Sequence, residues 1–454
     1  MPVFERHSTM PVSVEALSAY HVRRGAFERL IAPWQRVRVL GSAGRVRDGG
    51  RYAFDVGRKP LKWRWVVEVS GFDSGRQFTE RQLEGPFVFW EHTHRFVPRG
   101  RDESELADRV VYRLPADWVS NAVATGAVTR RLERLFRFRH ACVRNDLERH
   151  AAWSERSRVK VAIAGAGGLI GSHLAVYLTT AGHDVVRLVR RPVRGAGEVT
   201  WDPDAGHLDP RSLDGVEAVV NLAGVNLTSI WTKGRKEAIL GSRVRSTRTL
   251  VAAMERMETP PAVLVSASAV GAYGSRGDEA LTELSDRGTG FLAKVCREWE
   301  AAAAPAAAVG VRVVTPRLGI VLAASGGALA AMLPVFRAGL GGRIGPGWQW
   351  WPWVALEDVL GALEWLIHDR ELDGVVNVVA PEDVTNREFT RTLGRVLRRP
   401  ASLEVPRGVV ESFGGMPEEM LLASQRVVPA RLNMRGFRFA FPSLEAALRY
   451  ELGR

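Results

Sequence analysis

The chain has 454 residues, of which 46% are hydrophobic and 25% are charged. This length predicts two or three domains, and this composition excludes wholesale disorder and a collagen-like fibre. Cys142 and Cys296 are the only two cysteines. They exclude a disulfide framework and a cysteine-rich zinc module, so we expect a reducing, cytoplasmic location.

Neither a membrane nor a nucleic acid is an expected partner. The N-terminal segment lacks the basic start and apolar core of a signal peptide, and glycines and a proline interrupt the longest uncharged stretch, 318–336. The formal charge is +13, with 27 basic against 18 acidic residues up to position 150. Such an excess can attract nucleic acid. Only six of the 63 basic residues are lysine, however, and a biased genomic base composition explains that excess of arginine equally well.

The first 115 residues alternate between apolar and polar side chains, as in an antiparallel sheet. A helical pattern, Val14–Phe27, follows the first strand, and a long one, about Asn121–His150, follows the last. A curved sheet closed by a long helix tends to enclose a cavity. The expected strands are Val3–Thr9, Arg36–Leu40, Tyr52–Val56, Trp63–Val69, Phe78–Leu83, Val88–Val97 and Arg109–Leu114.

This order of elements resembles the START-like fold in its polyketide cyclase/dehydrase (SRPBCC) branch. The strand Trp90–Phe96 (WEHTHRF) and the segment Asp108–Pro115 (DRVVYRLP) carry the local similarity. The resemblance implies an α+β helix-grip domain over residues 1–150. It also implies a hydrophobic small molecule bound between the sheet and the long helix.

Two polar groups in this region have two interpretations each. His92 and His94 share one face of a strand and can ligate a metal together. No acidic or cysteine partner lies nearby on that face of the strand, so we favour a polar sheet face and expect no metal site. The arginines of the long helix can bind phosphates, but a solvated outer face is the favoured interpretation. They are Arg130, Arg131, Arg134, Arg137, Arg139 and Arg144.

A second domain begins after a short expected linker, 151–158. The apolar strand Val159–Ala164 runs into the turn Gly165–Gly171, a helical pattern follows, and a second strand covers Asp184–Val189. In such a βαβ unit the first glycine permits a tight turn, the second admits a pyrophosphate, and the third lets helix and strand pack closely. The pattern therefore predicts a dinucleotide site.

The end of the second strand indicates which dinucleotide binds. An NAD site usually places an acidic residue there, on the ribose hydroxyls. This chain has Arg190 and Arg191 instead. Guanidinium groups suit a 2′-phosphate, so we expect NADP, with NAD less favoured. The alternative is that both arginines only face solvent.

Ordered motifs over about 300 residues make the chain resemble the extended short-chain dehydrogenase/reductases, in an atypical epimerase-like branch that ends in a small domain of unknown function. The motifs include Asn221–Gly224, Ser266–Gly274, Arg317–Leu322, Trp353–Asp358 and Asn377–Pro381. The resemblance implies an α/β fold: a doubly wound parallel-sheet Rossmann domain over 159–400 and a small C-terminal substrate lobe (DUF1731-like) over 401–454.

The same resemblance assigns residues to the cofactor. Glycines would cradle the pyrophosphate, Arg190 would meet the 2′-phosphate, and Arg243 would reach the cofactor from its helix. The full set is Gly165, Gly168, Leu169, Ile170, Gly171, Arg190, Leu222, Ala223, Gly224, Arg243 and Ser266.

The catalytic residues are harder to assign. Family members that transfer hydride use a tyrosine four residues before a lysine, and here Lys294 is present while Gly290 holds the tyrosine place. Tyr273 is a possible substitute, against the alternative of a packing residue in a turn. Ser268 can bind a substrate carbonyl or satisfy backbone groups. We predict Ser268, Tyr273 and Lys294 as the catalytic set.

The sequence thus predicts an NAD(P)-dependent oxidoreductase or epimerase acting on a small organic substrate, an apolar one if the first domain holds or delivers it. The alternative is a non-catalytic NADP-binding regulatory or ligand-carrier protein. The resemblance also implies a homodimer, through helices at about 235–257 and 291–303.

Overall fold

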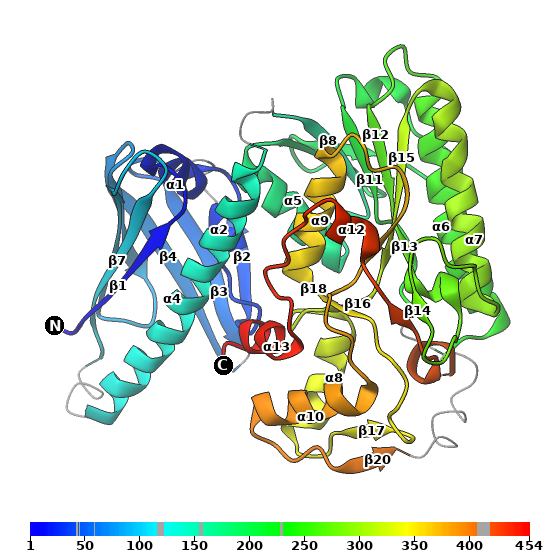
Figure 1. Ribbon diagram of the computed structural model, residues 1–454. Helices are drawn as coiled ribbons and strands as arrows, with labels where there is room; N and C mark the ends of the chain where they lie inside the picture. Colours follow the sequence, from blue (N-terminus) through cyan, green and yellow to red (C-terminus); the bar gives the residue numbers. More distant parts are fainter. Residues whose placement is uncertain are drawn as a thin grey trace. The chain divides into compact units, whose positions relative to one another are not determined.

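The computed structural model describes residues 1–41, 44, 46–58, 60–115, 122–153, 158–227, 230–405 and 418–454. The chain divides into two compact units (Figure 1). The first runs to residue 157 and includes 176–183 and 452–454; the second comprises 158–175 and 184–451. The division falls inside the expected linker, of which residues 154–157 lie outside the described part of the chain.

The first unit contains a seven-stranded antiparallel sheet in the order β1-β7-β6-β5-β4-β3-β2. All seven strands expected from the alternation are confirmed, with ends that shift by a few residues. Helices α1 (Val14–Val22) and α2 (Ala26–Arg29) lie between β1 and β2 in the chain, and α4 (Ala122–Ala151) follows β7. The strands are β1 Val3–Met10, β2 Val37–Gly41, β3 Arg51–Arg58, β4 Leu61–Asp73, β5 Gln77–Glu84, β6 Phe89–Pro98 and β7 Ser104–Arg113.

Aromatic side chains fill much of the space between this sheet and α4. The Phe4 and Phe136 rings lie 5.2 Å apart, and Trp65 and Trp90 lie 5.3 Å apart. A cavity of about 40 Å³ lies beside them, lined in part by Glu80, His94 and Arg139. Small-molecule sites usually measure about 300–1,000 Å³ and are mostly apolar. This cavity therefore gives no support to the expected hydrophobic ligand.

The interpretation of His92 and His94 as a polar sheet face is wrong. Both point into the unit, with 2% and 7% of their surface exposed. Their acidic partners come from neighbouring strands, Glu80 on β5 and Asp108 on β7, which pair with β6. These partners could not be predicted from the sequence, because only the strand register brings them beside the histidines.

The arginine series on α4 is mixed. Arg130, Arg131, Arg137 and Arg144 are exposed, as expected of a solvated outer face. Arg139 instead lines the cavity of the first unit.

The second unit is built on a parallel sheet in the order β10-β9-β8-β11-β12-β15-β13, and β19 pairs with β15. Every residue of β11 and β12 is buried, which explains their uninterrupted apolar sequences. The strands are β8 Lys160–Ala164, β9 Asp184–Val189, β10 Glu198–Thr200, β11 Ala218–Asn221, β12 Val263–Ser266, β13 Ser268–Ala269, β15 Arg312–Leu318 and β19 Gly374–Val378.

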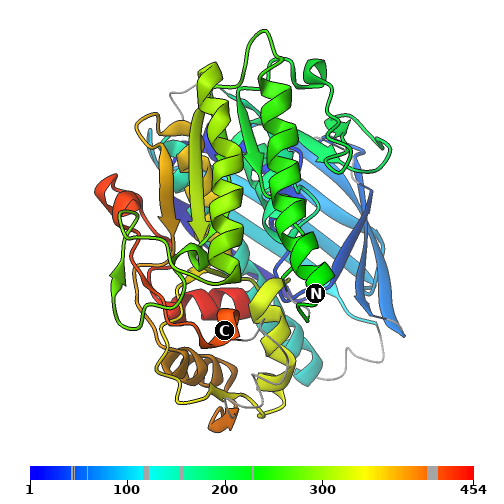
Figure 2. The ribbon, with the colours of Figure 1, turned by 90° about the vertical axis from the view of Figure 1, so that its right-hand side faces the viewer.

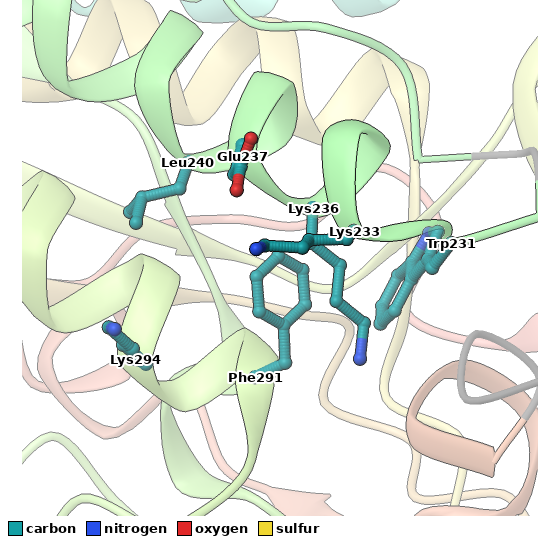
Figure 3. A pocket seen from close by; sticks show the side chains of 7 residues that line it. All are labelled: Trp231, Lys233, Lys236, Glu237, Leu240, Phe291 and Lys294. Atoms are coloured by element: carbon teal, nitrogen blue, oxygen red, sulfur yellow. The ribbon is translucent and has the colours of Figure 1, made fainter.

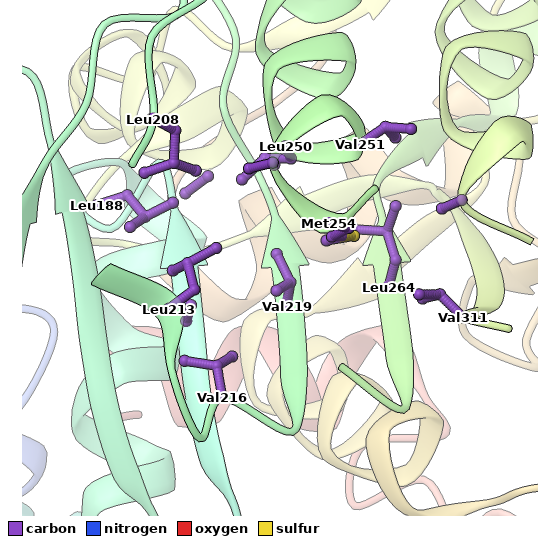
Figure 4. Close-up of a cluster of buried hydrophobic side chains, with 14 of the residues drawn as sticks. Leu188, Leu208, Leu213, Val216, Val219, Leu250, Val251, Met254, Leu264 and Val311 are labelled. Carbon is purple, nitrogen blue, oxygen red and sulfur yellow. The ribbon is translucent and has the colours of Figure 1, made fainter. Parts of the chain in front are cut away.

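Helices cover this sheet, as the doubly wound prediction requires. α6 (Lys233–Met254) and α7 (Phe291–Ala303) lie side by side (Figure 2). Val219 and Leu264 of the sheet pack against Leu250 and Met254 of α6 (Figure 4). Two further helices are α5, Leu169–Ala181, and α9, Leu356–His368, and short 3₁₀ turns cover Pro210–Leu213, Val270–Tyr273 and Ala304–Val309.

The smaller C-terminal lobe draws on segments from before residue 401. β20 (Leu403–Val405) pairs with β17 (Gly342–Ile344), and β21 (Arg426–Val427) pairs with β14 (Ala280–Leu281). The expected tail therefore completes small sheets that earlier segments begin. The other elements are β16 Ile320–Leu322, α8 Gly327–Arg337, β18 Trp353–Ala355, α10 Asn386–Leu397, a π turn at Glu418–Leu422, α12 Ala430–Met434 and α13 Leu444–Leu452.

Candidate nucleotide and substrate site

The turn between β8 and α5 can be built only with glycine at its key positions. Gly165 has φ +79°, and a Cβ there would lie 2.6 Å from the backbone of Leu222. A Cβ on Gly171 would lie 2.3 Å from the carbonyl oxygen of Gly165. The Gly168 amide donates to that same oxygen at 2.9 Å. The chain thus brings bare backbone and the N-terminus of α5 together, as a dinucleotide pyrophosphate requires, and the residues fit this group.

The segment after β11 forms the neighbouring edge. The Leu222 amide donates to Ala164 O at 2.9 Å, and the Ala223 amide donates to Asn221 Oδ1 at 3.2 Å. Asn221 is held in turn by a hydrogen bond to Thr247. The predicted residues Leu222 and Ala223 therefore lie directly against the glycine turn.

Arg243 lies beside this edge but already has partners. A Cβ on Gly224 would lie 3.0 Å from the Arg243 guanidinium carbon. Its Nη1 donates to the carbonyls of Val225 and Ile239, and its guanidinium lies 5.1 Å from the centre of the Trp299 ring. Burial lowers the pKa of Arg243. The side chain supports the loop after β11, and its predicted contact with the cofactor stays a prediction.

The structure distinguishes the two arginines that follow β9. Arg191 donates two hydrogen bonds to Glu198, at 2.9 and 2.6 Å, and these bonds lower the pKa of Glu198 to about 2. Arg190 is exposed and has no hydrogen bond or ion pair within the described part of the chain. The guanidinium of Arg190 is therefore available to a phosphate, whereas that of Arg191 is already paired.

Ser266 ends β12 at the carboxyl edge of the sheet, opposite Asn221. Its side chain is 1% exposed, and its Oγ has no hydrogen-bond partner among the residues described. An unpartnered buried hydroxyl is costly. It fits the predicted role of Ser266 at the cofactor, where a bound polar group would satisfy it.

The hydroxyl of Ser268 has a buried partner. It donates to Glu300 Oε1 at 2.7 Å. The same carboxylate receives two bonds of 2.9 Å from Arg317 and one of 2.7 Å from Arg287. Ser268 therefore belongs to a buried ionic cluster and bonds a distant carboxylate, not the backbone groups that the sequence alternative named. Its catalytic role stays a prediction.

Tyr273 is also buried, with 0% exposed surface. Its hydroxyl donates to Asn377 Oδ1 at 2.7 Å, and its ring lies 4.7 Å from the Arg317 guanidinium. Burial raises the pKa of Tyr273. This environment favours the packing alternative. The partner could not be predicted from the sequence because it lies 104 residues away.

The structure explains why a tyrosine is absent before Lys294. Gly290 precedes α7 with φ +101°, and a Cβ there would lie 3.2 Å from the Glu419 carboxylate. That carboxylate accepts hydrogen bonds from the amides of Phe291 and Leu292, at 3.0 and 2.7 Å. A tyrosine at position 290 would be strained and would displace this cap.

Lys294 lines a pocket of about 400 Å³ between the first turns of α6 and α7 (Figure 3). Lys236 lies over the Phe291 ring at 5.2 Å, and Trp231 meets that ring edge-on at 5.1 Å. With Lys233, three of the six lysines of the chain line one pocket. The sequence reasoning missed Lys233 and Lys236, although the rarity of lysine among 63 basic residues is a usable signal.

No helix in the described ranges is long and apolar enough to cross a membrane.

Comparison with known proteins extends over both units. The family model described as NAD dependent epimerase/dehydratase family matches residues 161–379, and the domain of unknown function DUF1731 matches 405–451. A crystal structure described as the nucleoside-diphosphate sugar epimerase from Corynebacterium glutamicum is 33% identical, with a TM-score of 0.82, and the match covers 99% of this chain and 90% of that one. The family models begin at residue 161, so the START-like assignment stays a prediction.

Two further relatives match the second unit. Epimerase family protein Mb2239 of Mycobacterium bovis is 43% identical over 296 residues, which is 65% of this chain and 98% of the relative. The human epimerase family protein SDR39U1, solved with NADPH, is 35% identical with a TM-score of 0.59, over 64% of this chain and 98% of that one. With a glycine turn that fits a dinucleotide and relatives this similar over nearly their whole length, the chain belongs to the epimerase family.

Proposed function

We propose that the chain is an NADP-dependent oxidoreductase or epimerase acting on a small organic substrate. The observation that carries the proposal is the glycine turn, where backbone groups occupy the space of a Cβ at Gly165 and Gly171. The unpaired Arg190 beside the paired Arg191 supports NADP over NAD. The human relative solved with NADPH supports the same choice.

The pocket at Lys294 supports a substrate with an anionic group. Lys233, Lys236 and Lys294 outnumber the one lining carboxylate, Glu237, and Trp231 and Phe291 offer ring faces. NADP, when bound, supplies hydride transfer. Of the three predicted catalytic residues, Lys294 is the one that lines this pocket. It would hold or exchange a proton there. Ser268 and Tyr273 would position the loop after β12 through their buried partners.

The cofactor assignment is tested by the Arg190→Ala variant. Because a guanidinium–phosphate bond is lost, we expect NADPH to bind about 10–100 times more weakly, while NADH binding stays within about twofold. Isothermal titration calorimetry measures both. Arg211→Ala, an exposed arginine of the same unit, is the control. Equal losses for the two cofactors, or no heat with either in the wild type, would contradict the proposal.

A second candidate is a non-catalytic NADP-binding regulatory or ligand-carrier protein. Gly290 in the tyrosine place and the engaged hydroxyls of Ser268 and Tyr273 favour it. NADPH oxidation measured across a panel of neutral and anionic carbonyl compounds distinguishes the two. Turnover that Lys294→Met abolishes without weakening NADPH binding supports the enzyme, and a panel without turnover supports the second candidate.

Three expectations remain as proposals. The order of the first unit's elements, with two helices after β1 and a long helix after β7, supports a START-like helix-grip domain. The adjacent helices α6 and α7 support the expected homodimer, which native mass spectrometry can test. A cytoplasmic location is proposed from the cysteine usage.

A further inference from the structure

Histidine and carboxylate side chains gather on the inner face of the first unit's sheet. Glu80 on β5 is directly opposite His92 on β6, and His94 on β6 is directly opposite Asp108 on β7. Residues two apart on a strand share a face, so both histidines point into the unit. His92, His94 and Asp108 are 2%, 7% and 3% exposed. The register thus concentrates ionisable groups in a buried place.

Three atoms of this cluster face one another without hydrogen bonds. Glu80 Oε2 lies 3.7 Å from His92 Nδ1 and 4.0 Å from His94 Nε2. The three atoms lie within 4.8 Å of one another. These separations are too long for hydrogen bonds. Ligands of a tetrahedral ion, bonded at about 2.0–2.1 Å, lie about 3.4 Å apart, so small side-chain movements would complete the geometry around an ion.

The second nitrogen of each histidine lies against Asp108. His92 Nε2 donates to Asp108 Oδ1 at 2.9 Å, and His94 Nδ1 lies 2.7 Å from the same oxygen. His140 of α4 donates to the other oxygen at 2.7 Å. Metal-binding histidines usually give their second ring nitrogen to a carboxylate, which fixes the ring and its tautomer. Asp108 has that relation to His92, and its Oδ1 also lies against His94 Nδ1, in contact but without hydrogen-bond geometry.

The cluster also favours positive charge at its centre. A neutral His92 that donates its Nε2–H to Asp108 directs the lone pair of its Nδ1 at the Glu80 carboxylate. This arrangement is unfavourable unless a cation lies between the two groups.

One side of the cluster is open. The cavity of about 40 Å³ is lined by Glu80 and His94, and by Arg139, Tyr52 and Phe78. A water molecule needs about 10–15 Å³ measured in this way, so the cavity has room for roughly three. An ion held by three protein ligands would keep a coordination position on this side, as catalytic zinc ions do. Arg139 adds a cation to the lining of this cavity, which favours an anion beside the ion.

We propose that Glu80, His92 and His94 bind a divalent transition-metal ion such as Zn²⁺, with Asp108 orienting His92 through its hydrogen bond and lying against His94. A further coordination position faces the cavity and takes water or a small oxyanion held against Arg139. The site is separate from the dinucleotide turn, and it does not depend on the proposed oxidoreductase activity.

Co²⁺ is the probe, because it replaces Zn²⁺ in such sites and its visible spectrum reports its coordination. The full-length protein, stripped with a chelator, is titrated with Co²⁺. We expect a saturable visible band that Zn²⁺ removes, at least about tenfold weaker binding in Glu80→Gln and His94→Gln, and about 10–100-fold weaker binding in Asp108→Asn. His7→Gln, whose side chain is 57% exposed in the same unit, should bind as the wild type does.

Two results would overturn the site. One is a wild-type protein that shows neither a Co²⁺ band nor a higher melting temperature with Zn²⁺. The other is a Co²⁺ band that Glu80→Gln leaves unchanged. Circular dichroism checks folding; should His94→Gln fail to fold, Glu80→Gln decides, because it keeps the size of the side chain. NADPH binding by the same proteins is measured in separate titrations. A failure of the metal-site proposal is therefore distinguishable from a failure of the cofactor proposal.

Discussion

Single residues near the sheet edge show how a hydroxyl gains or loses a chemical role. Ser268 and Tyr273 lie close to where catalytic groups are expected, but each donates its proton to a buried acceptor, Glu300 or Asn377. Ser266, in contrast, has a buried hydroxyl with no partner among the described residues. A hydroxyl that is already bonded stabilises the fold, and an unbonded one is available to a ligand.

Tyr273→Phe tests this distinction. The change removes the bond to Asn377 and leaves that acceptor buried, so we expect a loss of about 1–3 kcal/mol in the free energy of unfolding. Any turnover should change by less than about twofold, because the hydroxyl is buried and already donates to Asn377. Urea unfolding and initial rates measure the two effects.

Tyr112→Phe is the control in the other unit, since Tyr112 is also buried and its hydroxyl bonds to Thr129. A large loss of rate in Tyr273→Phe with unchanged stability would contradict the structural role and restore Tyr273 as a catalytic residue.

Among the elements, α7 matters most to the site because its first turn carries Lys294. The helix begins directly after Gly290, and the Glu419 carboxylate accepts from two of its first amides. A negative group at this end also interacts favourably with the helix dipole. The start of α7, and with it the position of Lys294, therefore depends on a residue more than a hundred positions later.

Glu419→Gln should weaken this cap. The amide keeps one acceptor but loses the second acceptor and the charge, so we expect about 1 kcal/mol lower stability. Thermal unfolding measures it, and amide hydrogen exchange at Phe291 and Leu292 should become faster. Glu298→Gln, a half-buried position on the same helix with only a 3.9 Å ion pair to Lys294, should change stability by less than about 0.5 kcal/mol. Equal effects of the two variants would refute the capping role.

At the scale of the whole molecule, two differently built units each contain a buried carboxylate held by several donors. Asp108 in the first unit is surrounded by three histidines, and Glu300 in the second binds Arg317, Arg287 and Ser268. Such groups must remain charged for the fold to be stable. We therefore expect low pH to destabilise the folded state by protonating a few buried carboxylates, and not through the formal net charge of +13.

Acid should unfold the second unit through Glu300. Burial by itself raises the pKa of Glu300, but the bonds from Arg317 and Ser268 outweigh it and lower that pKa below its ordinary value of 4.5. A lowered folded-state pKa gives stability that is complete above the unfolded value and is lost as the pH falls through the folded value. We therefore expect the melting temperature to fall steeply below about pH 4.5.

Calorimetry of Glu300→Gln checks this expectation. The variant should lose about 3–5 kcal/mol at neutral pH, because Arg317 is left without its partner. It should also show a shallower decline in acid. Glu255→Gln, an exposed acid directly after α6, should follow the wild-type curve. A Glu300→Gln curve parallel to the wild type would show that another group controls acid unfolding.

The sequence by itself determined the features that depend on neighbours along the chain. Alternating side chains located all seven strands of the first unit, because the period of a strand is local. The spacing of Gly165, Gly168 and Gly171 identified the dinucleotide turn, because φ +79° and backbone packing there tolerate no Cβ. The place directly after β9 also indicated Arg190 and Arg191 as candidates for a 2′-phosphate, and the contact of Arg190 with that group stays a prediction.

Only the tertiary structure decided which distant groups meet. Strand register put Glu80 and Asp108 beside His92 and His94, and so replaced an expected polar surface with a buried cluster. Packing places the Tyr273 hydroxyl in a hydrogen bond with Asn377. The hydrogen bonds to Glu198 engage Arg191 and so distinguish it from Arg190. The reason is physical: a hydrogen bond or ion pair depends on positions in space to within a few tenths of an ångström, and spacing along the chain carries no such information.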